Sequence, residues 1–263
     1  MGRSLPGPLS LWFAVVFGRA REPKLVADGV VQLGTDLVNW FLVGTDSGVV
    51  AVDTGLPGYE TGLERGLSLL GCSPGDLEAI LLTHSHSDHS GGAEALRRRH
   101  GASVHVHAAE ADAASVGAVV GKTGGSTLPY LRHPHAWRLL AHFRTAGMPP
   151  PIEELQPYDD GAELPGGFRA VLTDGHTPGH CVLHLPSRGL LFAGDHIATT
   201  NPLTGSRGPE IPPRPLNQSS ESMLASLERL EELDASTALF GHGEPWRDGI
   251  GAAVRRARAA GIT

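Results

Sequence analysis

The chain has 263 residues, of which 40% are hydrophobic and 19% charged, a composition typical of a globular protein with one large domain. Its formal net charge is −7 and its lysines and arginines form no long run, which argues against nucleic acid as a partner. The two cysteines, Cys72 and Cys181, lie far apart and outside any C-x-x-C pair. Their placement argues against a disulfide framework or a thiolate zinc site and favours a cytoplasmic location.

The amino terminus carries an apolar run at residues 9–17, after Arg3 and before Ala20, in the order of a signal peptide. The run has only nine residues and an arginine stands inside the would-be cleavage site, so secretion is the weaker alternative. A membrane span would need about 20 apolar residues, so no stable membrane insertion is expected. We expect residues 1–24 to form an amphipathic segment packed on a single domain that spans residues 25–263.

The first part of that domain is predicted to be a sheet followed by helices. Three β-rich runs, at 30–33, 37–43 and 48–52, are separated by turn residues and predict an antiparallel meander. A helical apolar pattern follows at 59–70, and a short second helix is predicted at 74–78.

A short apolar strand is predicted at 79–82, directly before the run His84-Ser85-His86-Ser87-Asp88-His89. A helix at 93–100 follows this run, and residues 103–107 alternate like a further strand. A strand, a loop rich in reactive side chains and a helix are the usual order around an active site. The next segment, 108–157, shows no strand pattern and is predicted to be a partly helical insertion that could act as a lid.

The remaining part returns to alternating strands and helices. Strands are predicted at 168–172, 182–185, 190–193 and 238–240, with helices near 219–233 and 248–260.

The histidine run concentrates the ligand types that suit zinc or iron when no thiolate is offered, namely imidazole nitrogen and carboxylate oxygen. His84 and His86 are two residues apart, so an extended segment points both to one side, and the following turn can aim Asp88 and His89 at a neighbouring point. The amino-acid composition would produce such a pattern by chance only about 0.002 times in a chain of this length. The run therefore predicts a metal site.

Residues 83–92, THSHSDHSGG, resemble the signature of the metallo-β-lactamase superfamily. Four further motifs resemble those of the family and follow in its order: D-T-G at 53–55, H-T-P-G-H at 176–180, G-D-H at 194–196 and G-H-G at 241–243. The resemblance implies an α/β (α+β) fold, the four-layer αββα sandwich, with two mixed sheets face to face, helices outside and the metals at one edge.

By the same resemblance, seven residues bind two metal ions. The first ion would be held by His84, His86 and His176, the second by Asp88, His89 and His242, and Asp195 would bridge both. The implied cofactors are two zinc ions, with iron or manganese as alternatives. Because five of these ligands are neutral and two anionic, a water between two dications is expected to ionise near neutral pH and to act as a hydroxide nucleophile.

Two carboxylates are candidates for catalysis. Asp88 is the candidate proton carrier. Asp53 resembles a family residue that lies near the metals without binding them, so we expect it to orient the site through hydrogen bonds. A turn at the end of a strand is the alternative explanation for Asp53. The residues that bind substrate are unknown from the sequence.

Several other residues have alternative explanations. His133 and His135 are explained by a solvated loop, with substrate binding as the alternative, whereas solvent exposure is expected for His105 and His107 on their strand. His180 is expected to be structural, and His196, which directly follows Asp195, is expected at most to support that ligand. Cys181 is expected to be buried. Three aromatic residues could line an apolar pocket or pack within the insertion: Tyr130, Trp137 and Phe143.

The function predicted from these features is that of a binuclear, lactonase-like metal-dependent hydrolase that opens an ester, lactone or thioester bond of a small molecule. The alternative from another reaction class is a sulfur or persulfide dioxygenase with one iron. β-Lactamase-type amide hydrolysis is a weaker alternative, because neither cysteine occupies a ligand position and the resemblance implies that β-lactamases with Asp-His-His in the second site generally lack the bridging aspartate that Asp195 supplies. A module used for binding alone is disfavoured because every ligand position is filled, and a homodimer remains open.

Overall fold

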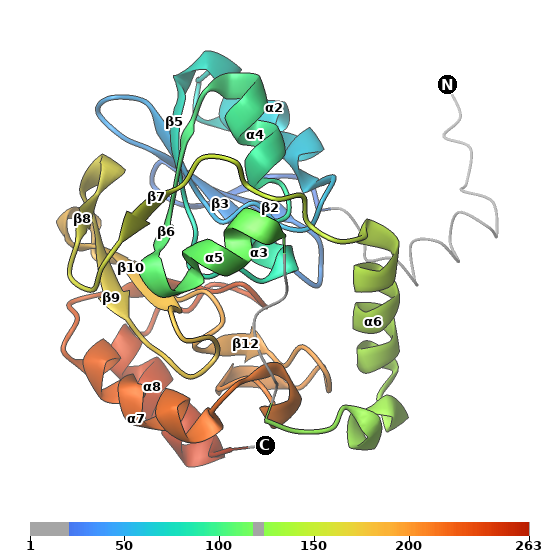
Figure 1. Cartoon of the computed structure of the whole chain (residues 1–263). Coiled ribbons are helices and arrows are strands. Elements are labelled where there is room, and N and C mark those ends of the chain that lie inside the picture. Colours follow the sequence, from blue (N-terminus) through green and yellow to red (C-terminus); the bar gives the residue numbers. More distant parts are fainter. Residues whose placement is uncertain (1–20, 118–123, 263) are drawn as a thin grey trace, which may run out of the picture.

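The computed structural model describes residues 21–117 and 124–262, and the apolar run predicted at residues 9–17 lies outside them. Within the described residues, a seven-stranded sheet and a five-stranded sheet face each other. Figure 1 shows helices on the outer side of each sheet. The predicted four-layer αββα sandwich is confirmed.

The first sheet pairs its strands in chain order. They are β1 (Lys24–Ala27), β2 (Val30–Gly34), β3 (Asn39–Gly44), β4 (Val49–Val52), β5 (Leu77–Leu81), β6 (Ser103–His107) and β7 (Gln156–Tyr158). The pairs from β1 to β4 are antiparallel, which confirms the predicted meander, and those from β4 to β7 are parallel.

The second sheet has the order β14-β11-β10-β9-β8. Its strands are β8 (Glu163–Leu164), β9 (Phe168–Leu172), β10 (Cys181–Leu185), β11 (Leu190–Phe192) and β14 (Thr237–Leu239). β11 and β14 are parallel and the other pairs antiparallel. A separate ribbon pairs β12 (Ala198–Thr200) with β13 (Arg207–Glu210).

The α-helices of the described part are α2 (Leu63–Leu69), α3 (Ser87–Ser90), α4 (Ala93–His100), α5 (Ala108–Val116), α6 (Pro134–Ala146), α7 (Ser220–Glu231) and α8 (Ile250–Ala260). Short 3-10 helices are η1 (Tyr59–Gly62), η2 (Pro74–Asp76), η3 (Leu128–Arg132), η4 (Pro165–Gly167), η5 (Pro186–Arg188) and η6 (Arg214–Leu216). None of the helices in the described ranges is long and apolar enough to cross a membrane.

The core explains why β3 is apolar from Trp40 to Val43. Successive side chains of a strand point to opposite faces. Phe41 therefore lies in the cluster between the two sheets, where its ring centroid is 5.4 Å from that of Phe192. Trp40 and Leu42 lie in the cluster under α2 and α4. Burial on both faces gives the near-continuous apolar run that the sequence shows.

Two predictions of local structure are wrong. The helix predicted at 74–78 ends at Asp76, because reciprocal hydrogen bonds between Ser73 and Asp76 close a single 3-10 turn and Leu77 is already the buried first residue of β5. Residues 108–157 were predicted to lack a strand, yet Gln156 begins β7 at the edge of the first sheet. An edge strand of three residues is too short to show a period.

Solvent exposure was also predicted wrongly for His107, which is buried. Its Nδ1 accepts a hydrogen bond from the backbone N–H of Ala109 and so caps the start of α5. Its ring lies against Tyr158, with the centroids 5.9 Å apart. His105, on the same face of the strand, is half-buried. Burial of Cys181 between the sheets is confirmed.

Candidate metal centre

The candidate ligands reach one edge of the sandwich from loops that follow strands of both sheets. The loop after β5 carries His84 to His89, the loop after β9 carries His176, and Asp195 and His242 follow β11 and β14. Because β11 and β14 run parallel, their carboxyl ends meet at the same edge. The fold therefore brings together residues that are up to 158 positions apart.

Three histidines form the first cluster. The ring nitrogens of His84, His86 and His176 lie within 4.8 Å of one another, and Nε2 of His176 is 2.9 Å from Nδ1 of His86. Nε2 of His84 is buried and makes no hydrogen bond within the described residues.

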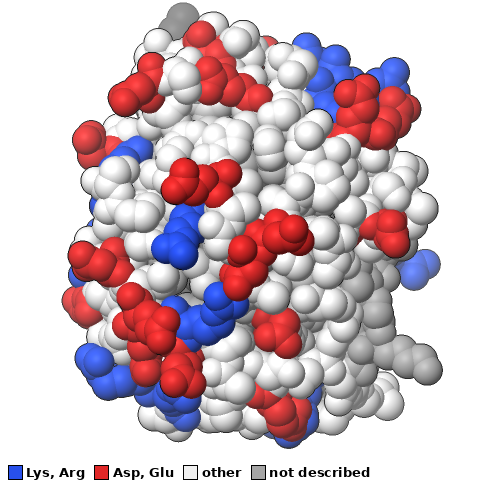
Figure 2. Space-filling model, turned by 60° about the vertical axis from the view of Figure 1, so that its left-hand side comes forward, with Lys and Arg blue, Asp and Glu red and all other residues white. Residues whose placement is uncertain are grey.

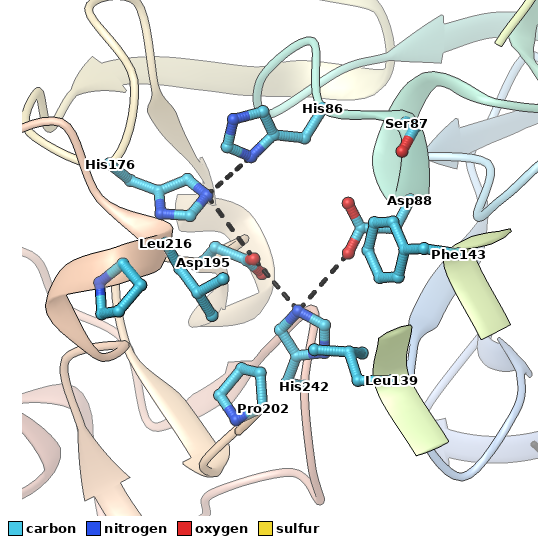
Figure 3. Close-up of a pocket in the computed structure, with 11 residues that line it drawn as sticks. His86, Ser87, Asp88, Leu139, Phe143, His176, Asp195, Pro202, Leu216 and His242 are labelled. Atoms are coloured by element: carbon cyan, nitrogen blue, oxygen red, sulfur yellow. Dashed lines mark hydrogen bonds and ion pairs between the residues drawn. The ribbon is translucent and has the colours of Figure 1, made fainter. Parts of the chain in front are cut away.

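The second cluster contains both carboxylates. Donor atoms of Asp88, His89, Asp195 and His242 also lie within 4.8 Å of one another. Oδ2 of Asp195 is 3.1 Å from Nε2 of His242 and 3.6 Å from Nε2 of His176, so this carboxylate reaches both clusters. Figure 3 shows Asp195 between the two histidines, with Asp88 facing His242 across the cavity.

The orientation of the rings leaves a nitrogen lone pair for a ligand. Nδ1 of His242 lies 2.6 Å from the carbonyl oxygen of Leu37, which can only accept, so Nδ1 donates and Nε2 faces the cluster unprotonated when the ring is neutral. Nδ1 of His176 similarly faces Oδ1 of Asn217 at 3.0 Å. A fixed tautomer of this kind is the usual arrangement of a histidine that binds metal.

The electrostatics of the two clusters differ. Burial lowers the pKa of His86 and His176 to about 4, and burial with the neighbouring rings holds that of His84 well below its usual value. In the second cluster burial acts in the same direction, but the carboxylate of Asp195 outweighs it and raises the pKa of His242 to about 8. The first cluster is therefore neutral, and the second attracts positive charge.

These observations fit a metal site. The donor set is imidazole nitrogen and carboxylate oxygen, which suits zinc or iron. Buried donor atoms without a hydrogen bond are costly, and at the site the described residues leave Nε2 of His84 in this state, while Nε2 of His89 and Oδ1 of Asp195 face each other at 3.2 Å. A cation bound at the two clusters would satisfy them.

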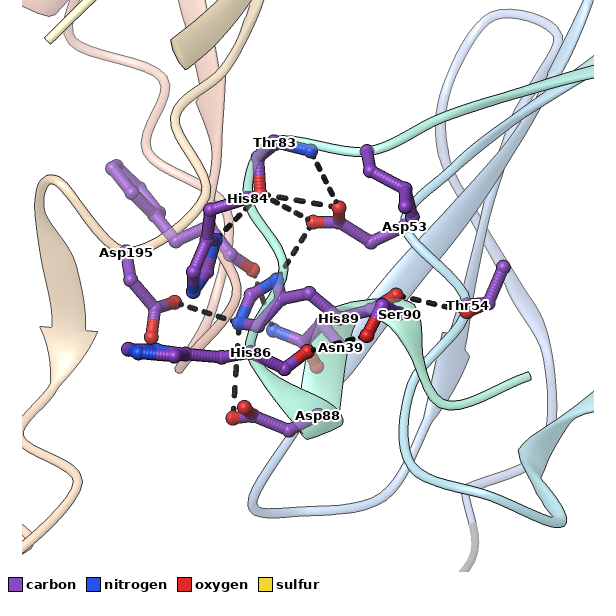
Figure 4. A network of polar contacts seen from close by, with 12 residues as sticks. Asn39, Asp53, Thr54, Thr83, His84, His86, Asp88, His89, Ser90 and Asp195 are labelled. Carbon is purple, nitrogen blue, oxygen red and sulfur yellow. Dashed lines mark hydrogen bonds and ion pairs between the residues drawn. The ribbon is translucent and has the colours of Figure 1, made fainter. Parts of the chain in front are cut away.

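Asp53 contacts the residues at both ends of the histidine run (Figure 4). Its Oδ2 lies 2.8 Å from Nδ1 of His89, and its Oδ1 accepts a hydrogen bond from the backbone N–H of Thr83 at 2.8 Å. Thr83 Oγ1 in turn lies 3.0 Å from Nδ1 of His84. The carboxylate thus contacts a distant loop, which favours the orienting role over a turn at the end of its own strand.

Asp53 also has a backbone φ of 57°, in the left-handed region, which Asn adopts at least as readily as Asp. Asp53→Asn should therefore fold without added backbone strain while it weakens the contact to His89. Loss of a residue that orients a metal ligand through a hydrogen bond typically lowers metal affinity about 10- to 100-fold. We therefore expect the Asp53→Asn protein to bind zinc more weakly by a factor in that range. Competition with a fluorescent zinc chelator measures it.

The matched control for that experiment is Asp46→Asn, at an exposed turn of the same sheet. It should retain the wild-type affinity. Equal affinities of the Asp53→Asn protein and the wild type would show that Asp53 does not orient the site.

Two asparagines that the sequence did not single out hold the last two loops. Asn217 orients His176 as described above and donates from Nδ2 to the carbonyl oxygen of Pro212. Asn39 donates from its side chain to the carbonyl oxygens of Phe240 and Gly243, on either side of His242. Asn39 interrupts an apolar run, and a buried polar residue in such a run is a signal that could have identified it.

The remaining histidines lie outside the two clusters. His180 accepts a hydrogen bond at Nε2 from the backbone N–H of Asp195, at 3.1 Å, and so supports the loop of that residue. His196 is buried behind it, 3.3 Å from Ser226 Oγ. Nitrogen atoms of His133 and His135 belong to neither cluster.

A further buried carboxylate, Glu110 on α5, joins the loops of the first cluster. It is fully buried, accepts from the N–H of Ser85 at 3.1 Å and from its hydroxyl at 2.5 Å, and accepts from the N–H of Gly179 at 2.8 Å. Ser85 lies between His84 and His86, and Gly179 lies three residues after His176. Glu110 thus connects the two chain segments that carry the three histidines.

Removing this connection should destabilise the protein. Glu110→Ala leaves two backbone N–H groups buried without a partner, each of which costs about 1–3 kcal/mol. We expect the free energy of unfolding to fall by about 3 kcal/mol or more in a urea titration. The matched control is Asp112→Ala on the exposed side of the same helix, which should change it by less than about 0.5 kcal/mol. Equal midpoints for the two variants would contradict this role of Glu110.

Comparison with known proteins identifies relatives of this chain. Residues 33–242 match the family model described as "Metallo-beta-lactamase superfamily". The "Probable metallo-hydrolase YflN" of Bacillus subtilis (strain 168) is 26% identical over 234 residues, which cover 83% of this chain and 85% of that protein.

A "Hydroxyacylglutathione hydrolase" of Rhodobacter capsulatus is 35% identical over 121 residues, which cover 46% of this chain and only 34% of that protein. Among solved structures, "Rm3 metallo-beta-lactamase" aligns with a TM-score of 0.69 at 20% identity, covering 97% of this chain and 96% of its own. At that identity the likeness concerns the fold.

Proposed function

The chain belongs to the metallo-β-lactamase superfamily, and from this premise we propose that it is a binuclear metal-dependent hydrolase that opens an ester, lactone or thioester bond of a small molecule. The observation that carries the proposal is the pair of adjoining donor clusters, joined by the carboxylate of Asp195. The names of two relatives, "Probable metallo-hydrolase YflN" and "Hydroxyacylglutathione hydrolase", support a hydrolase.

The proposed ligands are those of the two clusters. His84, His86 and His176 would hold one ion, Asp88, His89 and His242 the other, and Asp195 would contact both. We propose zinc, with iron or manganese as alternatives. Bound dications would lower the pKa of a water molecule toward neutrality and polarise the carbonyl group of the substrate.

Asp88 is the proposed proton carrier. Its carboxylate lines the cavity, and its Oδ2 lies 3.5 Å from Nε2 of His242. From this position it can accept a proton from the attacking water and return it to the oxygen or sulfur of the leaving group, so that one water is consumed for each bond broken. Asp53 is proposed to act indirectly, by orienting His89.

The alternatives predict different properties. A dioxygenase with one iron at the first cluster would leave Asp88, His89 and His242 without a metal, so the observed clusters favour the binuclear hydrolase. A nucleic-acid substrate is disfavoured, because the face in Figure 2 intersperses acidic with basic side chains and the net charge is −7.

The experiment that tests the proposed function is a pH-indicator screen of the metal-loaded protein against lactones, alkyl esters and thioesters. Acid release from at least one of these classes, at a rate proportional to enzyme concentration, is the expected result. Consumption of oxygen with a persulfide donor, without acid release from any of the three classes, would replace the hydrolase with the dioxygenase.

A further inference from the structure

The cavity above the two clusters has an apolar wall. Its volume is about 170 Å³, below the range of about 300–1,000 Å³ common for drug-sized ligands, so a small substrate fits it. One side consists of cluster residues (Figure 3). Besides Ser87, the rest of the lining consists of five apolar residues: Leu139, Phe143, Pro202, Pro215 and Leu216.

The helix that supplies part of this wall is fixed to the body of the protein. Leu139 on α6 packs with Leu37 and Val38 in one buried cluster. One turn along the helix, Nε2 of His142 makes a short hydrogen bond with the hydroxyl of Tyr59. Leu37 is also the residue whose carbonyl oxygen contacts His242. The wall and the second cluster are therefore held by the same turn, which makes the wall part of the site.

The charges around the cavity are unsuited to an anionic substrate tail. No lysine or arginine of the described ranges lines it. The cations on neighbouring elements have partners elsewhere: Arg138 contacts Asp36 at 2.6 Å, and Arg214 contacts Glu221 at 2.8 Å. A carboxylate held against the apolar wall would lose its hydration with no lysine or arginine beside it to pair with, which is costly.

We propose that the site selects uncharged substrates whose short hydrocarbon acyl chain lies against the wall of Leu139, Phe143 and Leu216, and that it discriminates against substrates with a carboxylate on that chain. This inference rests on the proposed hydrolase function and adds the substrate class. Simple aliphatic esters and lactones would be substrates, whereas thioesters and amides with an anionic acyl part would be poor ones.

The first test is a series of 4-nitrophenyl esters: acetate, butyrate, hexanoate and the hemisuccinate. Each methylene that enters the apolar cavity should raise kcat/KM about 3- to 4-fold until the cavity is full. The hemisuccinate, which resembles the butyrate in length, should be about 100-fold slower than it. A flat series, or a hemisuccinate as fast as the butyrate, would overturn the proposal while leaving hydrolysis itself established.

Variants of α6 locate the effect. Phe143→Ala should lower kcat/KM for the hexanoate about 10-fold more than it lowers kcat/KM for the acetate, because the longer chain makes more contact with that side chain. Phe143→Lys should lower the ratio of kcat/KM for the butyrate to kcat/KM for the hemisuccinate, because the lysine places a positive charge at the wall. The matched control is Leu140→Ala, since Leu140 is 41% exposed on the same helix, and it should leave the ratios unchanged. Ratios that shift equally in the control would overturn the assignment.

Binding without turnover separates this inference from the proposed function. Calorimetric titration of the metal-loaded protein with hexanamide and with adipamate, its ω-carboxylate counterpart, should give at least about 10-fold tighter binding of the uncharged amide. If no ester is hydrolysed but hexanamide binds preferentially, the hydrolase proposal fails and the assignment of the cavity stands. Preferential binding of adipamate would overturn the assignment of the cavity.

Discussion

Removal of divalent metal with a chelator is expected to abolish ester hydrolysis, and two equivalents of zinc per chain are expected to restore it. The two clusters bring seven donor side chains together, and without cations the buried Nε2 of His84 has no hydrogen-bond partner within the described residues. Because metal binds the folded chain more tightly than the unfolded one, the stripped protein should also melt at a lower temperature. At 100 times the dissociation constant, each site adds about 2.7 kcal/mol to the free energy of unfolding.

The measurement is elemental analysis of protein purified without added metal, followed by titration of zinc into the stripped protein with activity and melting temperature as readouts. A break at two equivalents supports the binuclear centre. Full activity at one equivalent of iron, with oxygen consumed, would contradict it and favour the dioxygenase. Zinc that restores the melting temperature without restoring hydrolysis would remove the catalytic proposal and leave the metal site.

Asp88→Asn is expected to lower kcat by about 10³-fold in a protein that remains folded. General acid–base catalysis contributes about 10²- to 10⁴-fold, and an amide at this position cannot accept and return the proton. The carboxylate is also one of two in the second cluster, so its loss should weaken metal binding there. Steady-state kinetics at saturating zinc separate the two effects, because the affinity loss is compensated and the loss of proton transfer is not.

Ser87→Ala is the matched control for Asp88→Asn. Ser87 is the preceding residue, is buried to a similar extent and also lines the cavity, but its hydroxyl is not assigned to either cluster. The Ser87→Ala protein should keep kcat within about 3-fold of wild type. A fully metallated Asp88→Asn protein with a rate near that of wild type would exclude Asp88 as the proton carrier.

The concentration of histidine and aspartate in residues 84–89 pointed to a metal site from the sequence alone, whereas His176, Asp195 and His242 were assigned through the resemblance of their motifs to those of the family. The sequence could not locate residues whose role depends on contacts between distant segments. Asn217 is 41 positions from His176, and Asn39 reaches a backbone more than 200 positions away. Glu110 is an ordinary helical glutamate in the sequence, and only its burial against Gly179 shows its role.

Helices and strands could be predicted where the apolar pattern extends over enough residues and one face of the element is buried. The helix at 93–100 and the strand at 103–107 have the bounds that the sequence indicates. Short edge elements such as β1, β8, β12 and β13 were missed, since strands of two to four residues carry too few alternations to be distinguished from loops. The apolar wall of the cavity was missed for another reason: Phe143 has the same helical spacing whether it packs within the insertion or faces a ligand.

The two sheets are built from consecutive parts of the chain. Strands up to Tyr158 belong to the first sheet and strands from Glu163 onward to the second or to the ribbon, so the chain crosses between the sheets once, at 159–162. Each half can form most of its pairings alone, whereas each donor cluster draws side chains from both halves. High-affinity metal binding should therefore occur only after the two halves have docked. Metal occupancy would then report completed folding, and partly folded chains would not bind an ion tightly.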